Sequence, residues 1–113
     1  MKTKHLIIEH SKGVDFLELG NIVFCQADDN WTTITHRSQK TSNVCQTLKS
    51  IETRIDNNRF FRVHRSFLVN MDCIETIYGS YEILELKGGY RIPVSRRRRS
   101  ALKAAIKKAV NPV

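Results

Sequence analysis

The segment FFRVHRSFLVNMD, residues 60–72, interleaves β-forming side chains with cationic and polar ones more densely than any other part of the chain. Its apolar side chains fall on one side of a period-two pattern: Phe61, Val63, Phe67 and Val69. This pattern predicts two extended segments packed against a core. Arg65 interrupts the pattern, and an unpaired guanidinium is costly to bury, so we expect a bend at residues 64–66 that turns Arg65 outward. An arginine held at such a bend offers a planar donor fork suited to phosphate or to a guanine edge.

The other basic segment is YRIPVSRRRR, residues 90–99, in which the end of another predicted strand directly precedes four arginines. Residues 91–113 contain eight basic side chains and no acidic one, and these eight equal the entire net charge of +8. The first 90 residues carry eleven basic and eleven acidic side chains and are neutral. Charge segregated in this way indicates a surface that binds a polyanion.

Strand composition and turn residues recur along most of the chain. Strands are predicted at residues 5–10, 14–19, 22–27, 31–36, 74–78, 82–87 and 90–94, in addition to the two around Arg65. Gly13, Gly79 and the pair at residues 88–89 mark turns, and Pro93 requires an edge position because proline cannot donate to a ladder. We therefore expect one domain, residues 1–113, that is mainly β with antiparallel sheets.

A short amphipathic helix is predicted at residues 43–56. Val44, Leu48, Ile51 and Ile55 recur at helical spacing, and Cys45 widens this apolar face. We expect the helix to cover the sheet and to carry no chemistry.

A C-terminal helix of about 14 residues is predicted to follow Ser95, which is well placed as its N-cap. Its apolar face is formed by Leu102, Ala105, Ile106, Ala109 and Val110. The same helical wheel groups four basic residues on another face: Arg96, Arg99, Lys103 and Lys107. Arg98 falls on the apolar side, so only part of the arginine run is expected to face a ligand.

Three segments, in order and spacing, resemble the LytTR DNA-binding domain of bacterial transcription regulators. They are residues 61–70, residues 88–97 and the Asp29-Asn30-Trp31 sequence after a predicted strand. The resemblance covers nearly the whole chain. It implies a mainly antiparallel β fold that reads double-stranded DNA through loops, as the output domain of a two-component response regulator or as a stand-alone regulator. It also implies paired half-sites on DNA and, in a full-length protein, a receiver domain upstream.

The resemblance assigns base contacts to Asn30, Arg65 and Arg96. Asparagine can contact adenine, and arginine can contact guanine O6 and N7, with two hydrogen bonds each. We expect phosphate contacts from a second set of residues: Arg62, His64, Ser66, Arg99 and Lys103. Asp28 and Asp29 precede Asn30 and would repel phosphates, so that loop has to enter the groove away from the backbone. From the residues alone, tolerance of a left-handed turn is the preferred explanation of Asn30.

Three alternatives remain open on the residues alone. An RNA-binding module would grip RNA with the arginine run and stack bases on Tyr90 or Trp31. A metal-dependent nuclease would use Asp72, Glu85 and Lys87 in a D…E-x-K arrangement. An anionic-membrane patch would combine Lys103, Lys107 and Lys108 with the apolar helix face.

The remaining composition offers little sign of enzyme chemistry. Cys25, Cys45 and Cys73 have no C-x-x-C spacing, so we interpret them as small buried hydrophobes of a protein in a reducing, cytoplasmic compartment. The four histidines are scattered, and neither a cofactor nor a metal site is expected. We expect a domain that is not an enzyme and is a monomer in solution, with two copies on DNA.

Overall fold

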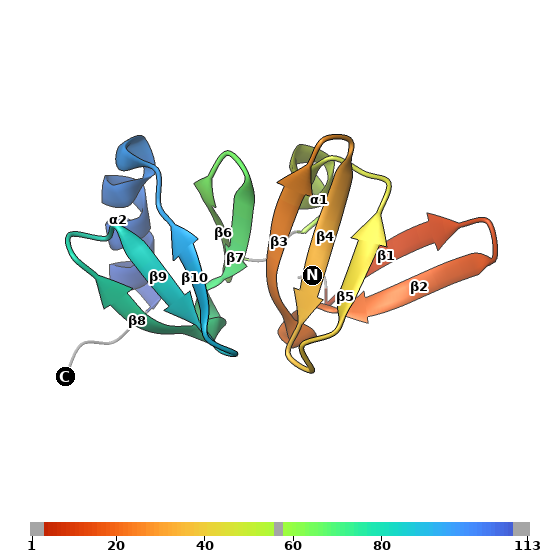
Figure 1. The fold of residues 1–113 in the computed structure, drawn as a ribbon, viewed down its shortest axis with the longest axis horizontal. Helices are drawn as coiled ribbons and strands as arrows, with labels where there is room; N and C mark the ends of the chain where they lie inside the picture. Colours follow the sequence, from red (N-terminus) through yellow and green to blue (C-terminus); the bar gives the residue numbers. More distant parts are fainter. Residues whose placement is uncertain (1–3, 56–57, 110–113) are drawn as a thin grey trace.

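The computed structural model describes residues 4–55 and 58–109, and its layout follows from three antiparallel sheets (Figure 1). The largest has five strands in the order β5-β4-β3-β7-β6. Its strands are β3 (Ile22–Asp28), β4 (Trp31–His36), β5 (Thr41–Val44), β6 (Phe60–His64) and β7 (Phe67–Asn70). The most apolar run of the sequence thus forms the central strand, β3.

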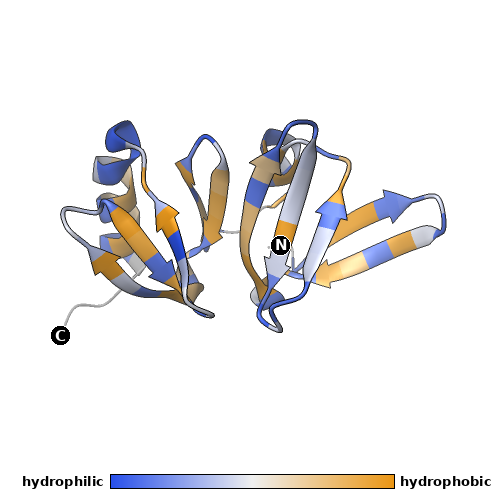
Figure 2. Ribbon diagram, viewed as in Figure 1, coloured by the Kyte–Doolittle hydropathy of each residue, from blue (hydrophilic) through white to orange (hydrophobic). Residues whose placement is uncertain are grey.

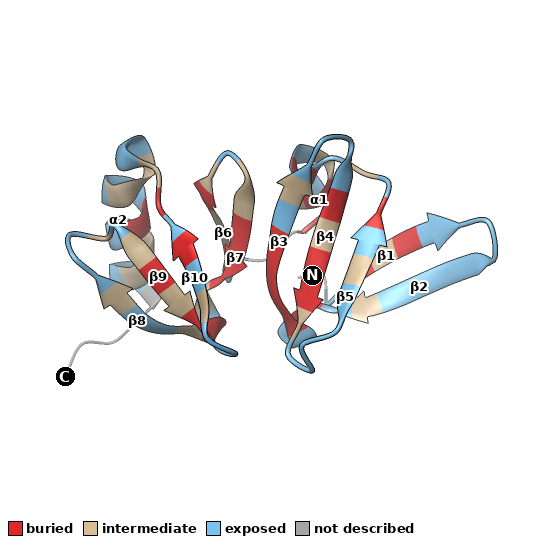
Figure 3. Cartoon of the chain, viewed as in Figure 1, coloured by how far each residue is buried: buried red, intermediate tan, exposed pale blue. Residues whose placement is uncertain are grey.

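Both faces of the five-stranded sheet are covered, which explains why its central strands are apolar on both sides. Along β3, Phe24 joins one apolar cluster and Cys25 the other; along β7, Val69 and Leu68 divide in the same way. Successive side chains of a strand point to opposite faces, so each strand contributes to two cores. Figure 2 shows hydrophobic segments, and Figure 3 buried ones, along β3 and β7.

The first cluster lies beneath the N-terminal hairpin and the helix α1 (Leu48–Arg54). The hairpin pairs β1 (His5–His10) with β2 (Gly13–Glu18), as predicted. It projects from one end of the molecule, and Figure 3 shows its outer half mostly exposed.

The second cluster lies between the five-stranded sheet, a three-stranded meander and the helix α2 (Arg99–Ala109). The meander has the order β10-β9-β8 and consists of β8 (Ile74–Tyr78), β9 (Ile83–Leu86) and β10 (Tyr90–Pro93). Gly88 and Gly89 form the β9–β10 turn with φ of 92° and 83°, values that favour glycine. Pro93 ends an edge strand, as its missing N–H requires.

The prediction of a helix over residues 43–56 is wrong in its first half. Residues Thr41–Val44 form the edge strand β5, in which Val44 pairs with Thr32 of β4 and its side chain is buried in the first cluster. Its spacing to Leu48 matches a helix only by coincidence. The helix begins after Thr47, whose Oγ1 accepts a hydrogen bond from the Ser50 amide at 3.1 Å. Cys45 lies before the helix and is exposed, which corrects its assignment to the apolar face.

The C-terminal helical segment begins as predicted but differs in its first turn. Arg96–Arg98 form a 3₁₀ turn that leads into α2, and the Ser95 side chain makes no capping hydrogen bond. Its Oγ instead donates to the Val63 carbonyl at 3.4 Å. Leu102 is fully buried, and Ala105 and Ile106 are half-buried, whereas Val110 lies outside the described residues. Within the described residues, no helix is long and apolar enough to span a membrane.

Candidate nucleic-acid interface

Three connections that are distant in sequence lie along one edge of the molecule. They are the β3–β4 turn, the β6–β7 bend and the segment from β10 into α2, all at the top of Figure 1. Figure 2 colours this edge predominantly hydrophilic. The sequence-predicted base contacts, Asn30, Arg65 and Arg96, belong one to each connection, and all three residues are exposed.

Backbone hydrogen bonds fix the central bend to its two neighbours. The Ala27 amide at the end of β3 donates to the Ser66 carbonyl at 2.9 Å. On the other side, the Ser95 amide donates to the Val63 carbonyl, also at 2.9 Å. The strand that leads into the β3–β4 turn is therefore hydrogen-bonded to the bend, and the segment after β10 is hydrogen-bonded to the strand that leads into the bend.

The bend itself has the predicted form. The register between β6 and β7 shifts between Arg62 and His64, as in a β-bulge, and Arg65 is turned into solvent. The Ser66 amide donates to His64 Nδ1 at 3.1 Å. A neutral His64 therefore carries its proton on Nε2, which leaves one N–H donor for a ligand. The His64 ring also packs against Phe67, with centroids 5.6 Å apart.

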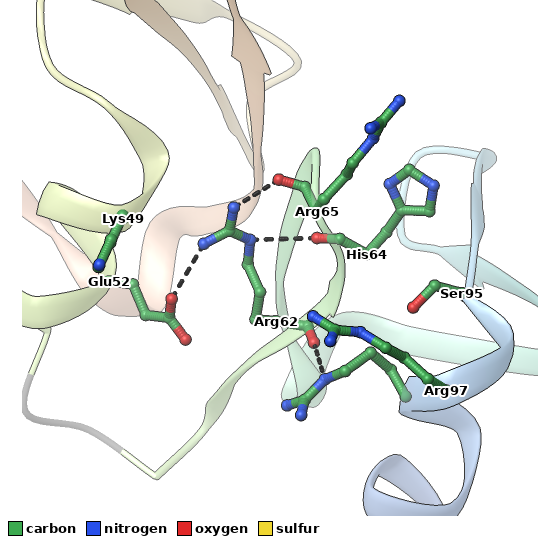
Figure 4. Close-up of a pocket in the computed structure, with 8 residues that line it drawn as sticks. Lys49, Glu52, Arg62, His64, Arg65, Ser95 and Arg97 are labelled. Carbon is green, nitrogen blue, oxygen red and sulfur yellow. Dashed lines mark hydrogen bonds and ion pairs between the residues drawn. The ribbon is translucent and has the colours of Figure 1, made fainter.

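Arg62 is held differently from its neighbours, because its guanidinium turns back into the protein (Figure 4). Its Nε donates to the His64 carbonyl at 3.1 Å, its Nη1 to Glu52 Oε1 at 3.0 Å, and its Nη2 to the Arg65 carbonyl. All three nitrogens are thus engaged within the chain. The structure does not place Arg62 among the outward-facing donors, against the expectation of a phosphate contact.

In the arginine run, Arg96 and Arg97 are exposed and Arg98 and Arg99 are half-buried, so Arg98 turns inward as predicted, but Arg96 and Arg99 are not equally exposed. Arg98 lies over the Phe61 ring at 4.7 Å, and its Nε donates to the Arg62 carbonyl at 2.9 Å. Arg99 Nε donates to the Val94 carbonyl at 3.3 Å, which leaves its other nitrogens for a ligand. Because residues 96–98 form a 3₁₀ turn, the single helical face predicted for Arg96, Arg99, Lys103 and Lys107 begins only at Arg99.

Comparison with known proteins agrees with this geometry. The model of the LytTr DNA-binding domain family matches residues 12–107. The chain belongs to the LytTr DNA-binding domain family. A solved structure, the LytTr DNA-binding domain of a methyl-accepting/DNA response regulator from Bacillus cereus, superimposes with a TM-score of 0.77. It is 23% identical and covers 93% of this chain and 98% of its own, so it shows the shared fold.

Curated relatives of this LytTr domain are bacterial regulators. The sensory transduction protein LytT of Bacillus subtilis is 32% identical over 105 residues, and the positive alginate biosynthesis regulatory protein of Pseudomonas aeruginosa is 33% identical over 99. The heme-containing CO-sensing transcriptional regulator RcoM 1 of Paraburkholderia xenovorans is 34% identical over 95. These matches cover 87%, 82% and 80% of this chain but only 42%, 39% and 35% of the relatives.

Sequence reasoning missed part of the groove beside the bend. This groove has a volume of about 760 Å³ and is lined by Lys49, Glu52, Arg62, His64, Arg65, Ser95, Arg97 and Arg98. Lys49 and Glu52 come from α1, for which no chemistry was expected. Their place beside the bend depends on how α1 packs, and no local sequence pattern encodes it. Their spacing of three residues on the polar helix face was the one available signal.

The β3–β4 turn requires a correction to the sequence reading. Asp29, with φ of 55°, adopts the left-handed conformation that had been offered as an explanation for Asn30. The turn therefore does not need asparagine at position 30 for its backbone. The Asn30 side chain is exposed and makes no hydrogen bond to another described residue.

The structure of this LytTr domain does not support the RNA-binding alternative or the nuclease alternative. Tyr90 is half-buried against Phe24, with ring centroids 5.2 Å apart, whereas Trp31 is 50% exposed. Asp72 pairs with Arg59 at 3.0 Å and Glu85 with Arg91 at 3.2 Å. In the described part of the chain, no three His, Cys, Asp or Glu side chains are grouped as metal ligands.

The cysteines also differ from nucleophiles in their surroundings. Burial raises the pKa of Cys25 to about 12 and raises that of Cys73 as well, so both thiols stay protonated near neutral pH. Cys25 and Cys73 are buried hydrophobes as predicted; the exposed Cys45 is not.

We expect Arg98→Ala to lower the free energy of unfolding by about 1 to 2 kcal/mol, because it removes a cation–π contact and a hydrogen bond to a carbonyl. Its effect on DNA affinity should be small. Arg97→Ala is the matched control: Arg97 is exposed, so its removal should leave stability within about 0.5 kcal/mol. Urea unfolding of both variants measures the difference, and equal stabilities would show that the Phe61 contact contributes nothing.

Proposed function

We propose that this LytTr domain binds double-stranded DNA sequence-specifically through its three tied connections and acts in bacterial transcription regulation. The observation that carries the proposal is the row of exposed Asn30, Arg65 and Arg96 on connections joined by backbone hydrogen bonds. Connections that are held rigidly can point their side chains toward the bases in a DNA groove, and direct readout of the sequence requires this. The family and the regulatory relatives support the same conclusion.

In this proposal the contacts divide into two kinds. Asn30, Arg65 and Arg96 read base edges. Phosphates are contacted by the donors around them: His64, Ser66, Arg99 and Lys103. Arg62 remains a less suitable phosphate contact, because its guanidinium is already engaged by three acceptors. The proposal assigns the domain no catalytic role and no cofactor.

The whole protein is also a matter of proposal. The chain spans about two fifths of the length of the curated relatives it matches. We infer that in the full-length protein it serves as a DNA-binding output, with a receiver domain upstream as the family resemblance implies. Its place of action is then the cytoplasm, where bacterial DNA is found.

The first test is the salt dependence of binding. If about four to six basic side chains each displace a counterion, log Kobs should fall with log salt concentration with a slope of roughly −4 to −5. Titration of the preferred duplex at several salt concentrations, by fluorescence anisotropy, measures the slope. A competitor series of RNA and of anionic vesicles provides the control, and neither should displace the duplex at equal charge. A slope near zero would contradict the electrostatic part of the proposal.

We further propose that the domain is a monomer in free solution and occupies two adjacent half-sites, one copy on each. The apolar faces of both helices are used within the chain, since Leu48 and Ile51 enter the first cluster and Leu102 and Ile106 pack in the second. Neither helix therefore keeps an apolar stripe for a partner. Sedimentation at micromolar concentration should show a monomer without DNA and two copies per paired site. A stable dimer in the absence of DNA would contradict this.

A further inference from the structure

The Arg62 side chain links the helix α1 to the bend by hydrogen bonds. Arg62 leaves β6, crosses to Glu52 on α1, and reaches back to the carbonyls of both His64 and Arg65 (Figure 4). One carbonyl belongs to Arg65, the residue proposed to read a base, and the other to its neighbour His64. Their peptide planes are therefore fixed by the guanidinium, whose donors lie in one rigid plane.

The backbone of Arg62 is itself held from the other side. Its carbonyl accepts the hydrogen bond from Arg98 Nε at 2.9 Å, so α1 and the 3₁₀ turn that precedes α2 both contact the same residue. Figure 4 shows the Arg65 side chain pointing away from Arg62, toward solvent, while its carbonyl points toward it. The direction of the Arg65 side chain follows from the orientation of its peptide. A rotation of this peptide would move the Arg65 guanidinium away from a base edge.

We propose that Arg62 and Glu52 are positioning residues that set the base preference of Arg65, and that Arg62 acts through the bend and not through a phosphate. This inference rests on the proposed function, sequence-specific binding of duplex DNA by the bend. Glu52 anchors the guanidinium in the orientation that serves both carbonyls. Without that anchor, Arg62 is free to swing out toward solvent.

Because Glu52 is negatively charged, an electrostatic role and a positioning role predict opposite effects of its removal on affinity for the preferred duplex. A carboxylate 42% exposed beside a DNA-binding edge repels phosphates, so electrostatics alone predicts that its removal strengthens binding to every duplex. A positioning role for Glu52 predicts a different effect of its removal on DNA affinity. Loss of the anchor should lower affinity for the preferred duplex relative to a scrambled one, even though a negative charge has been removed.

The decisive experiment measures the ratio of affinities for the preferred and the scrambled duplex, with Glu52→Ala in the full chain, which removes both the charge and the acceptor of the Arg62 hydrogen bond. We expect this ratio to fall about fivefold or more, which is the lower end of what one bidentate base contact contributes. The loss should be confined to the base pair that Arg65 reads, as shown by repeating the selection of bound sequences. An unchanged ratio with tighter binding to both duplexes would overturn the inference.

Arg62→Lys provides a second, independent variant, because it keeps the positive charge and loses the planar fork. We expect the same fall in the affinity ratio with an unchanged salt slope. If the variant instead bound both duplexes equally more weakly, Arg62 would be a phosphate contact and the inference would be wrong. Urea unfolding of each variant establishes that the compared proteins are folded at the binding temperature.

Glu85→Ala is the matched control, since it breaks another glutamate–arginine pair, with Arg91 at 3.2 Å, in the separate three-stranded sheet. Its affinity ratio should equal that of the unmodified domain. Measuring the affinity ratio of the unmodified domain distinguishes failure of the proposed function from failure of the positioning inference. If it shows no preference between duplexes, the proposed function fails. If it shows a preference that Glu52→Ala and Arg62→Lys both retain, only the positioning inference fails.

Discussion

Replacing Arg65 with alanine is expected to remove about 1 to 3 kcal/mol of binding free energy for the preferred duplex and very little for a scrambled one. The reason is the position of Arg65 at an exposed bend that is hydrogen-bonded to β3 through Ser66 and is preceded by Val63, whose carbonyl is hydrogen-bonded to the Ser95 amide. A side chain aimed by a rigid sheet can make both hydrogen bonds to one guanine. Its removal should relax the preference at one base pair, which a repeated selection of bound sequences would identify.

Arg96→Ala should have an effect of similar size at a different base pair, since Arg96 begins the 3₁₀ turn that the Ser95 amide fixes to Val63. The control is Lys103→Ala, on the exposed side of α2. It should weaken binding to all duplexes alike and reduce the salt slope by roughly one unit. If Arg65→Ala and Arg96→Ala instead lowered the affinity for both duplexes equally, both arginines would be phosphate contacts, and the base-reading assignment would be wrong.

The strands around Arg65 are predictable from sequence because their signal is local. A period of two places Val63 and Val69 on one face of the sheet, and both residues are fully buried in the second cluster. Arg65 stands out because a charge interrupts that period, and the structure turns it outward. The edge position of Pro93 follows equally directly from its missing N–H.

The role of Arg62 could not be predicted in the same way, because its partner Glu52 is ten residues away on another element. A half-buried arginine and an exposed one look alike in sequence. Local spacing also misleads at Val44, where the match to a helical period hides a four-residue edge strand. Such short strands gain their stability from a neighbour, here β4, and not from their own residues.

In the arginine run, residues 96–99, the helical pattern predicts the position of one arginine correctly and that of another incorrectly. The helical wheel correctly turns Arg98 toward an apolar partner, Phe61, because a spacing of four residues links it to Leu102. The same wheel fails for Arg96, since a 3₁₀ turn has three residues per turn and rotates the first side chains away from the helical face. Which arginines reach DNA is therefore decided by the junction between β10 and α2.

That junction depends on the anchorage of α2, and Leu102→Ala is expected to have the largest effect on stability. Leu102 is fully buried in the second cluster together with side chains of the sheet and the meander, including Val63, Leu84 and Ile92. Truncating such a residue removes buried apolar surface and leaves a cavity, which should lower the free energy of unfolding by about 2 to 5 kcal/mol. Urea unfolding measures the change directly.

The loss should also reach the DNA-binding edge, because α2 continues directly from the 3₁₀ turn that carries Arg96, Arg97 and Arg98. At temperatures where the variant is still folded, we expect the amides of α2 to exchange with solvent faster than those of β3. Affinity for duplex DNA should fall together with this protection. Lys107→Ala, on the exposed side of the same helix, is the control and should change stability by less than about 0.5 kcal/mol. If Leu102→Ala were equally mild, α2 would be held by its arginine contacts to Phe61 and Val94, and the apolar anchor would not be what positions Arg96.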